Sequence, residues 1–581
     1  MKSRTNHPKN AKKTIQGIGI LAIIILVIMS SLQFRTISVL EFDEYTNNAG
    51  SISPNYWVLP DGKQIKLLTG ETRTIEGFDF CVMHDYLDLV GMHKYIERKL
   101  PAKKETRISL KLSEFTKPEK FICGTLPFAR PKRIRLIQPS YPYGKKQTYL
   151  GGTLVTVASQ LEAIGYEVEI LDMNINEFYS LELERGQFIG ITILGAPYIP
   201  KVIVYAEVLK RQGHTVLIGG QGIEGFSNEQ FKSLFGETAI QITNDNDLLS
   251  ALGEKDNTLP HTYDVSLINV LSKIDKRLLK HYLSHEMTMV MSQGCHFKCA
   301  FCAARKSRVE QFKSIVCFGK DMRFLAQSAK DFEISELNFY ATSLDFFQNP
   351  KTVFKYLELL RTIQQETGVK FKIRCLSCTP SFINAVHLIG VENFKHLMVS
   401  SGLWCVGLGI DGGDPTIWKA QKKNQNSISK NKDSLDLARE VGIRAEILMI
   451  MGFPQDNIKT LFKCVRDSIR YAWHWPNTML RPYLAKEFVP GNDSWKSGGP
   501  IVNSFISDPK KFYNLDFCAV GSKTTHPRFW HRMWSNASYL TIIGILTPFG
   551  RCVTSPLLPQ GNDGWYGKFA KWFNKIVPFD R

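Results

Sequence analysis

The chain has 581 residues, of which 44% are hydrophobic and 22% are charged; this is an ordinary globular composition with room for two or three domains. Its formal net charge is +19, but the lysines and arginines are spread along the chain, and no recognition module or basic–aromatic stripe supports nucleic-acid binding. A basic surface also suits anionic lipid or an anionic substrate. Three of the twelve cysteines are clustered, and the others are scattered, as buried thiols in a reducing compartment would be.

The N-terminus predicts a membrane anchor. Residues 1–13 form a basic tail without any acid, and an apolar run extends from Ile15 to Leu32. A helix of about 20 apolar residues spans a bilayer. A cleavable signal peptide shares this pattern, but no small-x-small cleavage site follows Ser31. We therefore expect an uncleaved single-pass transmembrane helix over residues 14–34.

The next regions are an N-terminal extension of unknown role, residues 35–130, and a domain of alternating strands and helices, residues 131–255. Strands are predicted at 134–137, 168–171, 188–193 and 215–218, with helices at 150–164 and 200–212. This alternation predicts a doubly wound parallel sheet, whose ligands lie beyond the carboxyl ends of the strands. Gly219 and Gly220 follow the fourth strand directly and allow close backbone approach to a bulky ligand.

A C-x3-C-x2-C cluster follows a linker with one helix, residues 256–284, and a strand at 287–291. Its cysteines are Cys295, Cys299 and Cys302. Three thiolates hold three irons of a [4Fe–4S] cluster, whose usual ligand set is four cysteines, and leave the fourth iron open for a small molecule. A zinc site with His296 or a remote group as the fourth ligand is an alternative.

Further strand–helix units follow, with strands at 337–340, 371–376, 405–410 and 445–451. The cysteine spacing, with the aromatic Phe301 before the last cysteine, resembles that of the radical S-adenosylmethionine (radical SAM) superfamily. Residues 407–413 are similar to the glycine-rich stretch that contacts SAM in that superfamily, and 451–454 to the element near its adenine. Residues 489–491 resemble its P-G-T segment, with Asn492 in place of threonine.

The resemblance implies a partial (β/α)6 barrel over residues 285–495, carrying a [4Fe–4S] cluster and SAM at the strand carboxyl ends. Many members carry glycines or acids after the strand at 337–340, where this chain has hydroxyl side chains that can still accept a hydrogen bond. The implied SAM contacts are Phe301, Thr342, Ser343, Gly409, Asp411, Gly412, Gly452 and Pro454.

Placed before such a barrel, the α/β domain resembles the Rossmann-like cobalamin-binding domain of cobalamin-dependent radical SAM enzymes. The loop at 138–144 contains no histidine, so the resemblance implies cobalamin bound without a protein histidine. A degenerate domain without cobalamin is the alternative. The implied cobalamin contacts are Ser140, Tyr141, Leu194, Gly195, Gly219 and Gly220.

The whole resemblance implies a C-methyltransferase. A 5′-deoxyadenosyl radical would remove a hydrogen atom from an unactivated carbon, and methylcobalamin would supply the methyl group. The alternatives are radical oxidation, cyclisation or carbon–carbon coupling without methyl transfer, and a non-catalytic membrane-tethered cobalamin or metal sensor. Expected partners are the membrane, a small-molecule or lipid-linked substrate, and a low-potential electron donor such as flavodoxin or ferredoxin; nucleic acid is not expected.

The C-terminal extension, residues 496–581, contains an apolar segment at 539–546 that is too short to span a bilayer and is expected in the core. Residues 564–577 predict an amphipathic helix with an aromatic face and a lysine face, suited to a membrane surface or to packing on the barrel mouth. The positive-inside rule would export the chain after residue 35. Cluster chemistry needs cytoplasmic reductant and assembly, so we predict a cytoplasmic catalytic body.

Overall fold

The computed structural model describes residues 132–142, 150–175, 186–254, 257–261, 264–303 and 310–554, and the backbone of four short strands before them. These strands form two antiparallel pairs, β1 (Tyr56–Val58) with β2 (Gln64–Lys66) and β3 (Thr72–Ile75) with β4 (Phe78–Cys81). The expected anchor at 14–34 and the expected amphipathic helix at 564–577 lie outside the described residues. No helix among the described residues is both long and apolar enough to cross a bilayer.

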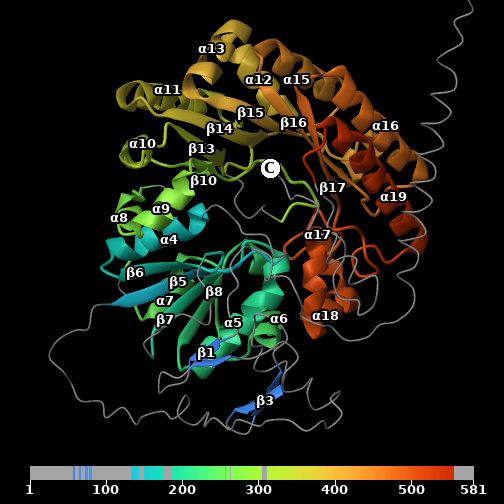
Figure 1. The fold of residues 1–581 in the computed structure, drawn as a ribbon. Helices are drawn as coiled ribbons and strands as arrows, with labels where there is room; N and C mark the ends of the chain where they lie inside the picture. Colours follow the sequence, from blue (N-terminus) through green and yellow to red (C-terminus); the bar gives the residue numbers. More distant parts are fainter. Residues whose placement is uncertain are drawn as a thin grey trace, which may run out of the picture.

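The first domain is a five-stranded parallel sheet in the order β6-β5-β7-β8-β9, the lower sheet in Figure 1. The four predicted strands are confirmed; β9 is only three residues long and was not predicted. In this 2-1-3-4-5 order the direction of winding reverses between β5 and β7, which is where such sheets bind ligands. The strands are β5 (Arg133–Gln138), β6 (Glu167–Asp172), β7 (Phe188–Thr192), β8 (Thr215–Gly219) and β9 (Ile240–Ile242).

Both predicted helices of this domain are confirmed, as α4 (Gly152–Ala163) and α5 (Ile199–Arg211). The loops after β7 and β8 lead into short 3-10 turns, which bring the backbone close to the sheet edge. The remaining elements of the domain are η3 (Ala196–Tyr198), η4 (Gln221–Ile223), α6 (Asn228–Phe235) and α7 (Asp245–Leu252).

The segment expected as a linker with one helix is packed into the core. It contains α8 (Ile268–Leu271) and α9 (Lys276–Leu283). Tyr282 is 1% exposed, and its hydroxyl donates to Asp172 Oδ2 over 2.6 Å, so α9 joins the end of β6 to the start of the second sheet. The two sheets therefore share one continuous hydrophobic core rather than being separated by a flexible connection.

The second domain is a six-stranded parallel sheet in the order β10-β13-β14-β15-β16-β17, which is the predicted partial barrel (Figure 1). Alternating burial along β14 and mainly buried runs in β15 and β16 are expected when helices cover the outer face of the sheet. The strands are β10 (Glu286–Met289), β13 (Glu336–Ala341), β14 (Lys370–Ser377), β15 (Leu403–Gly409), β16 (Arg444–Met451) and β17 (Thr478–Leu484).

The last strand, β17, was not predicted, because Arg481 and Pro482 interrupt its apolar run. Proline is tolerated there since β17 is an edge strand of the sheet. The barrel helices are α10 (Ile315–Asp331), α11 (Pro350–Thr367), α12 (Thr379–Ile389), α13 (Val391–Ser401), α14 (Pro415–Ala420), α15 (Ile428–Val441) and α16 (Ile458–His474). A small hairpin, β11 (Ser292–Gln293) with β12 (Gln311–Phe312), flanks the cysteine loop.

The C-terminal extension binds both domains. Its α18 (Gly499–Ser507) packs on α6, η5 (Pro509–Leu515) packs on α5 and η3, and α19 (Phe529–Leu546) packs on α16 and β17. Figure 1 shows α17 (Asp493–Ser497) below β17, α18 next to α6, and α19 beside α16. The predicted core segment at 539–546 is buried on one face of α19, through Tyr539, Ile542 and Leu546.

Candidate active site

The two parallel sheets present their carboxyl ends to each other. A Cβ atom on Gly225, after β8, would lie 1.9 Å from the amide nitrogen of Gly491, after β17. Tyr141, after β5, donates its hydroxyl to Asp516 Oδ2 over 3.0 Å. Because ligands of parallel α/β folds bind at strand carboxyl ends, both predicted ligand sites open towards the same region.

The cysteine loop, residues 295–302, follows β10 and β11 into this region. His296 donates its backbone N–H to Gln348 Oε1 over 2.8 Å, and Ala300 donates to the carbonyl of Gln421 over 2.8 Å. These contacts come from the loops after β13 and β15. The loop is thus held by its neighbours along the barrel rim, as a site for a preformed cofactor requires.

The three motif thiols are partly exposed. Burial raises the pKa of the Cys295 thiol to about 11, so iron binding there must displace a proton. Gln425 Nε2 lies 3.5 Å from Cys299 Sγ, where an amide donor can support a thiolate. Among the described residues no three histidine, cysteine, aspartate or glutamate side chains form a group that could hold one metal ion. A [4Fe–4S] cluster binds each thiolate to a different iron, so this donor set fits it.

Six of the eight predicted SAM contacts come together at the ends of β15 and β16. The ring of Phe301 lies 5.4 Å from that of Phe453, between centroids, so the cysteine loop touches the predicted adenine element. Gly412 donates its N–H to the carbonyl of Ile450 over 2.7 Å, which joins the two strand ends. The group consists of Phe301, Gly409, Asp411, Gly412, Gly452 and Pro454.

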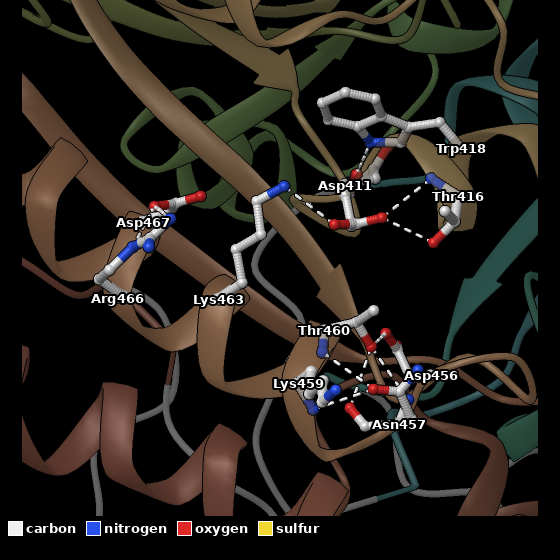
Figure 2. A network of polar contacts seen from close by, with 11 residues as sticks. Asp411, Thr416, Trp418, Asp456, Asn457, Lys459, Thr460, Lys463, Arg466 and Asp467 are labelled. Atoms are coloured by element: carbon white, nitrogen blue, oxygen red, sulfur yellow. Dashed lines mark hydrogen bonds and ion pairs between the residues drawn. The ribbon is translucent and has the colours of Figure 1, made fainter.

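Asp411, one of these predicted contacts, is buried and forms an ion pair with buried Lys423. Burial opposes the charge on Lys423, but the Asp411 carboxylate outweighs this and raises the pKa of Lys423. Trp418 Nε1 donates to the Asp411 carbonyl (Figure 2). It also lies 3.1 Å from the carbonyl oxygen of Ile410. The Asp411 carboxylate therefore neutralises the charge of Lys423. The hydrogen bonds from Trp418 fix the backbone of the turn that begins at Asp411.

Asn426 offers a polar atom at the same turn. Its Nδ2 donates to the carbonyls of Gly409 and Ile410, each over 2.9 Å, and two carbonyl acceptors fix the orientation of the amide. Its Oδ1 is buried and has no donor among the described residues. An amine or hydroxyl group of SAM could donate a hydrogen bond to this oxygen, so the turn fits a ligand that carries hydrogen-bond donors.

The turn after β16 is held on all four of its backbone polar groups. Gly452 and Phe453 each donate their N–H to Asp456 Oδ2 over 2.9 Å. His526 Nε2 lies 3.1 Å from the carbonyl oxygen of Gly452, and His531 Nε2 lies 2.8 Å from that of Phe453. Gly452 has φ of +78°, a conformation that favours glycine. This turn is therefore rigid before any ligand binds.

The groups that hold this turn have shifted pKa values. Burial raises the pKa of Asp456 to about 6, although Thr460 and the two N–H groups oppose the rise. Burial also lowers the pKa of His526 and of His531, so both rings are neutral at pH 7. Figure 2 shows Asp456 and Thr460 side by side at the start of α16.

The two predicted hydroxyl contacts, after β13, are bonded within the protein. Thr342 Oγ1 donates to the Met289 carbonyl over 3.3 Å, and Ser343 Oγ lies 2.8 Å from Ser292 Oγ. Asp345 beside them is 1% exposed and accepts three hydrogen bonds from residues 377–381. The structure thus places Thr342 and Ser343 beside the cysteine loop and gives them protein partners.

In the first domain the loop after β5 is polar and well packed. Lys201 Nζ donates to Ser140 Oγ over 2.7 Å, and Tyr205 OH lies 3.2 Å from the same oxygen. Tyr141 donates its N–H to Asn174 Oδ1 over 2.9 Å. Of the two residues predicted to contact cobalamin here, Ser140 is buried and Tyr141 is partly exposed towards the C-terminal extension.

The other four predicted cobalamin contacts, Leu194, Gly195, Gly219 and Gly220, are partly exposed, although Ile193 beside them is buried. Gly220 has φ of +107°, and a Cβ atom there would lie 2.7 Å from the Ile193 carbonyl oxygen. Glycine at this position is therefore required by the fold itself, whatever ligand binds. The exposed edge of these two loops is the surface left for a ligand.

Sequence reasoning assigned no role to Lys486, the second residue after β17. Its buried amine donates to the Ala519 carbonyl. Burial lowers the pKa of Lys486 to about 7, although Asp516 opposes this, and burial raises the pKa of Asp516. A lysine that follows an unpredicted strand gave no signal in the sequence.

Sequence reasoning also missed Asp456, Asn426 and the two histidines. Asp456 lies two residues after the predicted adenine element, so a search for an acid that binds the N–H groups of that turn could have found it. His526 and His531 lie more than 70 residues further along the chain, and only the docking of α19 brings them to the site.

Residues 289–467 match the family model described as the Radical SAM superfamily. This part of the chain is therefore a radical SAM domain, and such a domain implies a [4Fe–4S] cluster and SAM, which decides between the cluster and the zinc alternative. No match is found among the curated proteins.

Among solved structures the chain is similar to the radical S-adenosylmethionine methyltransferase TsrM from Kitasatospora setae with cobalamin and a [4Fe–4S] cluster bound. The identity is 15% over 61% of this chain and 75% of that chain, with a TM-score of 0.47. It is also similar to the cobalamin-dependent S-adenosylmethionine radical enzyme OxsB with aqua-cobalamin and S-adenosylmethionine bound. There the identity is 15% over 75% of this chain and 62% of that chain, with a TM-score of 0.46.

Proposed function

We propose that this chain is a membrane-anchored, cobalamin-dependent radical SAM enzyme that methylates an unactivated carbon. When bound, the cluster and SAM supply a 5′-deoxyadenosyl radical that removes a hydrogen atom, and cobalamin supplies the methyl group. The observation that carries the proposal is the junction at which the ends of two parallel sheets face each other, with Gly225 against Gly491. A radical enzyme with two large cofactors needs both beside one substrate, and this junction provides one shared region.

The residues of this chain have distinct parts in the proposal. Cys295, Cys299 and Cys302 hold the cluster. The turns after β15 and β16 hold SAM, and their backbone is fixed in advance, so binding SAM does not require them to be ordered first. Buried side chains around them exclude water, which protects a reactive radical from side reactions.

Cobalamin binding is supported by the sheet order and by the loops at its switch point. The loops after β7 and β8 leave Leu194, Gly195, Gly219 and Gly220 partly exposed, while η5 of the C-terminal extension packs on the neighbouring η3 and α5. No histidine lies in the described residues 138–142 after β5, so the corrin would have no lower ligand from this loop.

The first experiment is the absorption spectrum of full-length protein purified without oxygen and reconstituted with iron, sulfide and hydroxocobalamin. Iron–sulfur and corrin bands together are the expected result. Leu194→Trp is the test variant, because this side chain is partly exposed and a larger ring would fill the space beside the loop. The variant should lose corrin and keep the cluster. A wild-type protein that carries the cluster but no corrin would contradict cobalamin binding and favour the degenerate domain.

The second experiment separates methylation from other radical outcomes. With reductant and methyl-labelled SAM, a methylase transfers label to its product and releases both 5′-deoxyadenosine and S-adenosylhomocysteine. Formation of 5′-deoxyadenosine with an unlabelled product would support oxidation, cyclisation or coupling instead. Failure to cleave SAM at all would support the non-catalytic sensor.

Location and partners complete the proposal. The apolar segment at 14–34 would anchor the chain, the catalytic body would face the cytoplasm, and flavodoxin or ferredoxin would supply the electron. A small or lipid-linked substrate would fit an anchored enzyme. A reporter that fluoresces only in the cytoplasm, fused after Arg581, should be bright; a dark fusion with an active exported reporter at the same position would contradict this orientation.

A further inference from the structure

Exposed aromatic side chains gather on one outer surface of the barrel. Among the described residues, seven phenylalanines and tryptophans are exposed large hydrophobic side chains, and six of them lie on α16, α19 or η6 (Thr547–Phe549). Scattered exposed hydrophobic residues need no explanation, but contiguous ones mark interaction surfaces. The six are Phe462, Trp473, Phe529, Trp530, Trp534 and Phe549.

The two helices carry these residues at matching intervals. On α16, Ile458 and Phe462 are four residues apart, and Trp473 follows eleven later. On α19, Trp530 and Trp534 are four apart, and Ile545 follows eleven later. Steps of four and eleven are close to whole turns of an α-helix, so each set lies on one face of its helix.

The two faces form one surface. The helices α16 and α19 pack against each other, and Figure 1 shows them side by side on the outside of the barrel beyond β17. The ring of Trp473 lies 5.0 Å from that of Phe549, between centroids, so the stripes also meet at their C-terminal ends. The aromatic face is defined here as both stripes and Phe549, that is Ile458, Phe462, Trp473, Trp530, Trp534, Ile545 and Phe549.

The charges around the aromatic face are basic. The sequence of α19 contains no aspartate or glutamate. On α16 the only acid is Asp467, which forms an ion pair with its neighbour Arg466. Exposed cations nearby include Arg470 and Arg528. Aromatic side chains flanked by lysine and arginine are typical of elements that lie in the interface of an anionic bilayer.

We infer that the aromatic face docks on an anionic membrane, with Trp530, Trp534 and Phe462 in the interfacial layer and the flanking arginines on lipid phosphates. A second copy of this chain is a poorer occupant, because a symmetric contact would bring the same arginines together, and the acid that α16 and α19 carry, Asp467, already pairs with Arg466. Charge complementarity therefore selects anionic lipid.

The docked face lies beside the candidate active site. His531, in the first turn of α19, contacts the Phe453 carbonyl at the predicted SAM turn, and Trp530 precedes it. A substrate held in the same leaflet would reach the barrel mouth without leaving the lipid interface. This last step rests on the proposed function, whereas membrane docking itself does not.

The test uses the full-length protein, with its N-terminus intact, and vesicles of phosphatidylglycerol and phosphatidylcholine whose acyl chains are brominated. Bromine quenches only tryptophans near the lipid. The variant Trp530→Phe with Trp534→Phe should lose part of the quenched emission. The matched control, Trp404→Phe, removes a partly buried tryptophan near the opposite end of the barrel in β15 and should leave the quenched emission unchanged.

A second arm tests the charge. Arg466→Glu with Arg470→Glu should reduce quenching, as should replacing phosphatidylglycerol with phosphatidylcholine. Equal quenching in the tryptophan variant and the wild type would overturn the proposal, and would be the result if residues 555–581 covered the face. A wild-type dimer in detergent that Trp530→Ser with Trp534→Ser converts to a monomer would also overturn it. Reductive SAM cleavage in detergent is measured in parallel, so failure of docking is distinguished from failure of the proposed chemistry.

Discussion

The two sheets use glycine differently at their ligand-binding ends. In the barrel, Gly452 turns the backbone so that side chains bind its polar groups: Asp456 accepts its N–H and His526 lies against its carbonyl. In the first domain, Gly220 turns the backbone so that it packs directly on the backbone of Ile193. The barrel turn is fixed by specific side chains. The turn at Gly220 is fixed by close packing and by backbone hydrogen bonds, from the Ile193 N–H to the Gly219 carbonyl and from the Gly222 N–H to the Ile193 carbonyl. Loss of a hydrogen-bonding side chain should therefore disturb the barrel turn, whereas the turn at Gly220 should tolerate most side-chain changes that keep its backbone.

The largest effect is expected at the cluster. Cys299→Ala removes one of three thiolates, and the protein should lose its broad iron–sulfur absorbance and all reductive SAM cleavage. The measurement is the spectrum and 5′-deoxyadenosine formation after anaerobic reconstitution. The control is Cys378→Ser: Cys378 lies close enough to Cys295 and Cys299 to interact with them electrostatically, but it is outside the motif. A four-iron cluster that survives Cys299→Ala and cleaves SAM would refute the ligand assignment.

A smaller effect is expected at the junction between the sheets. Gly225→Ala places a methyl group against the backbone of Gly491 and should cost about 1–3 kcal/mol of unfolding free energy. Gly544→Ala in α19 is the control, since nothing lies within 4 Å of its Cβ position and alanine favours the helix. Thermal unfolding measures both. An unchanged Tm for Gly225→Ala would mean that the two sheets are not held together at this point.

Much of the fold could be predicted from the sequence. The strand patterns before residue 255 and after residue 285 predicted two parallel sheets, because buried parallel strands are nearly continuous apolar runs. The strands β9 and β17 were not predicted, because β9 is very short and β17 contains a proline. The segment 256–284 was read as a linker because its polar residues dominate, yet Tyr282 and its apolar neighbours pack into the core.

The parts of the candidate active site that stand in local sequence motifs could be predicted. Cys295, Phe301 and Gly412 lie together as expected, since each stands at a strand end in a recognisable stretch. His526 and His531 carry no local signal, because their role comes from a helix that packs on the barrel far along the chain. In the first domain, Gly220 is explained by packing within the fold, so its presence does not by itself identify a ligand.

The smallest predicted effect compares two carboxylates on either side of the SAM turns. Burial raises the pKa of Asp456 to about 6. Burial acts in the same direction on Asp414, but Thr416 and Lys463 outweigh it and hold the pKa of Asp414 below its usual value. Charge on Asp456 therefore opposes folding, and charge on Asp414 favours it. At neutral pH, Asp456→Asn should raise Tm by a few degrees and Asp414→Asn should lower it.

The dependence on pH tests the sign of each effect. The folded state binds the Asp456 proton more tightly than the unfolded chain, so its contribution is complete below about pH 4 and is lost as the pH rises to about 6. The advantage of Asp456→Asn should therefore grow from pH 4 to 6 and then stay constant. The contribution of Asp414 is present above its unfolded pKa and is lost only in stronger acid, so Asp414→Asn should show no change between pH 6 and 8. Thermal unfolding of both variants and the wild type across this range provides the measurement. If Asp456→Asn lowers Tm at pH 7.5, the turn after β16 needs the charge on its carboxylate and not only the shape of the side chain.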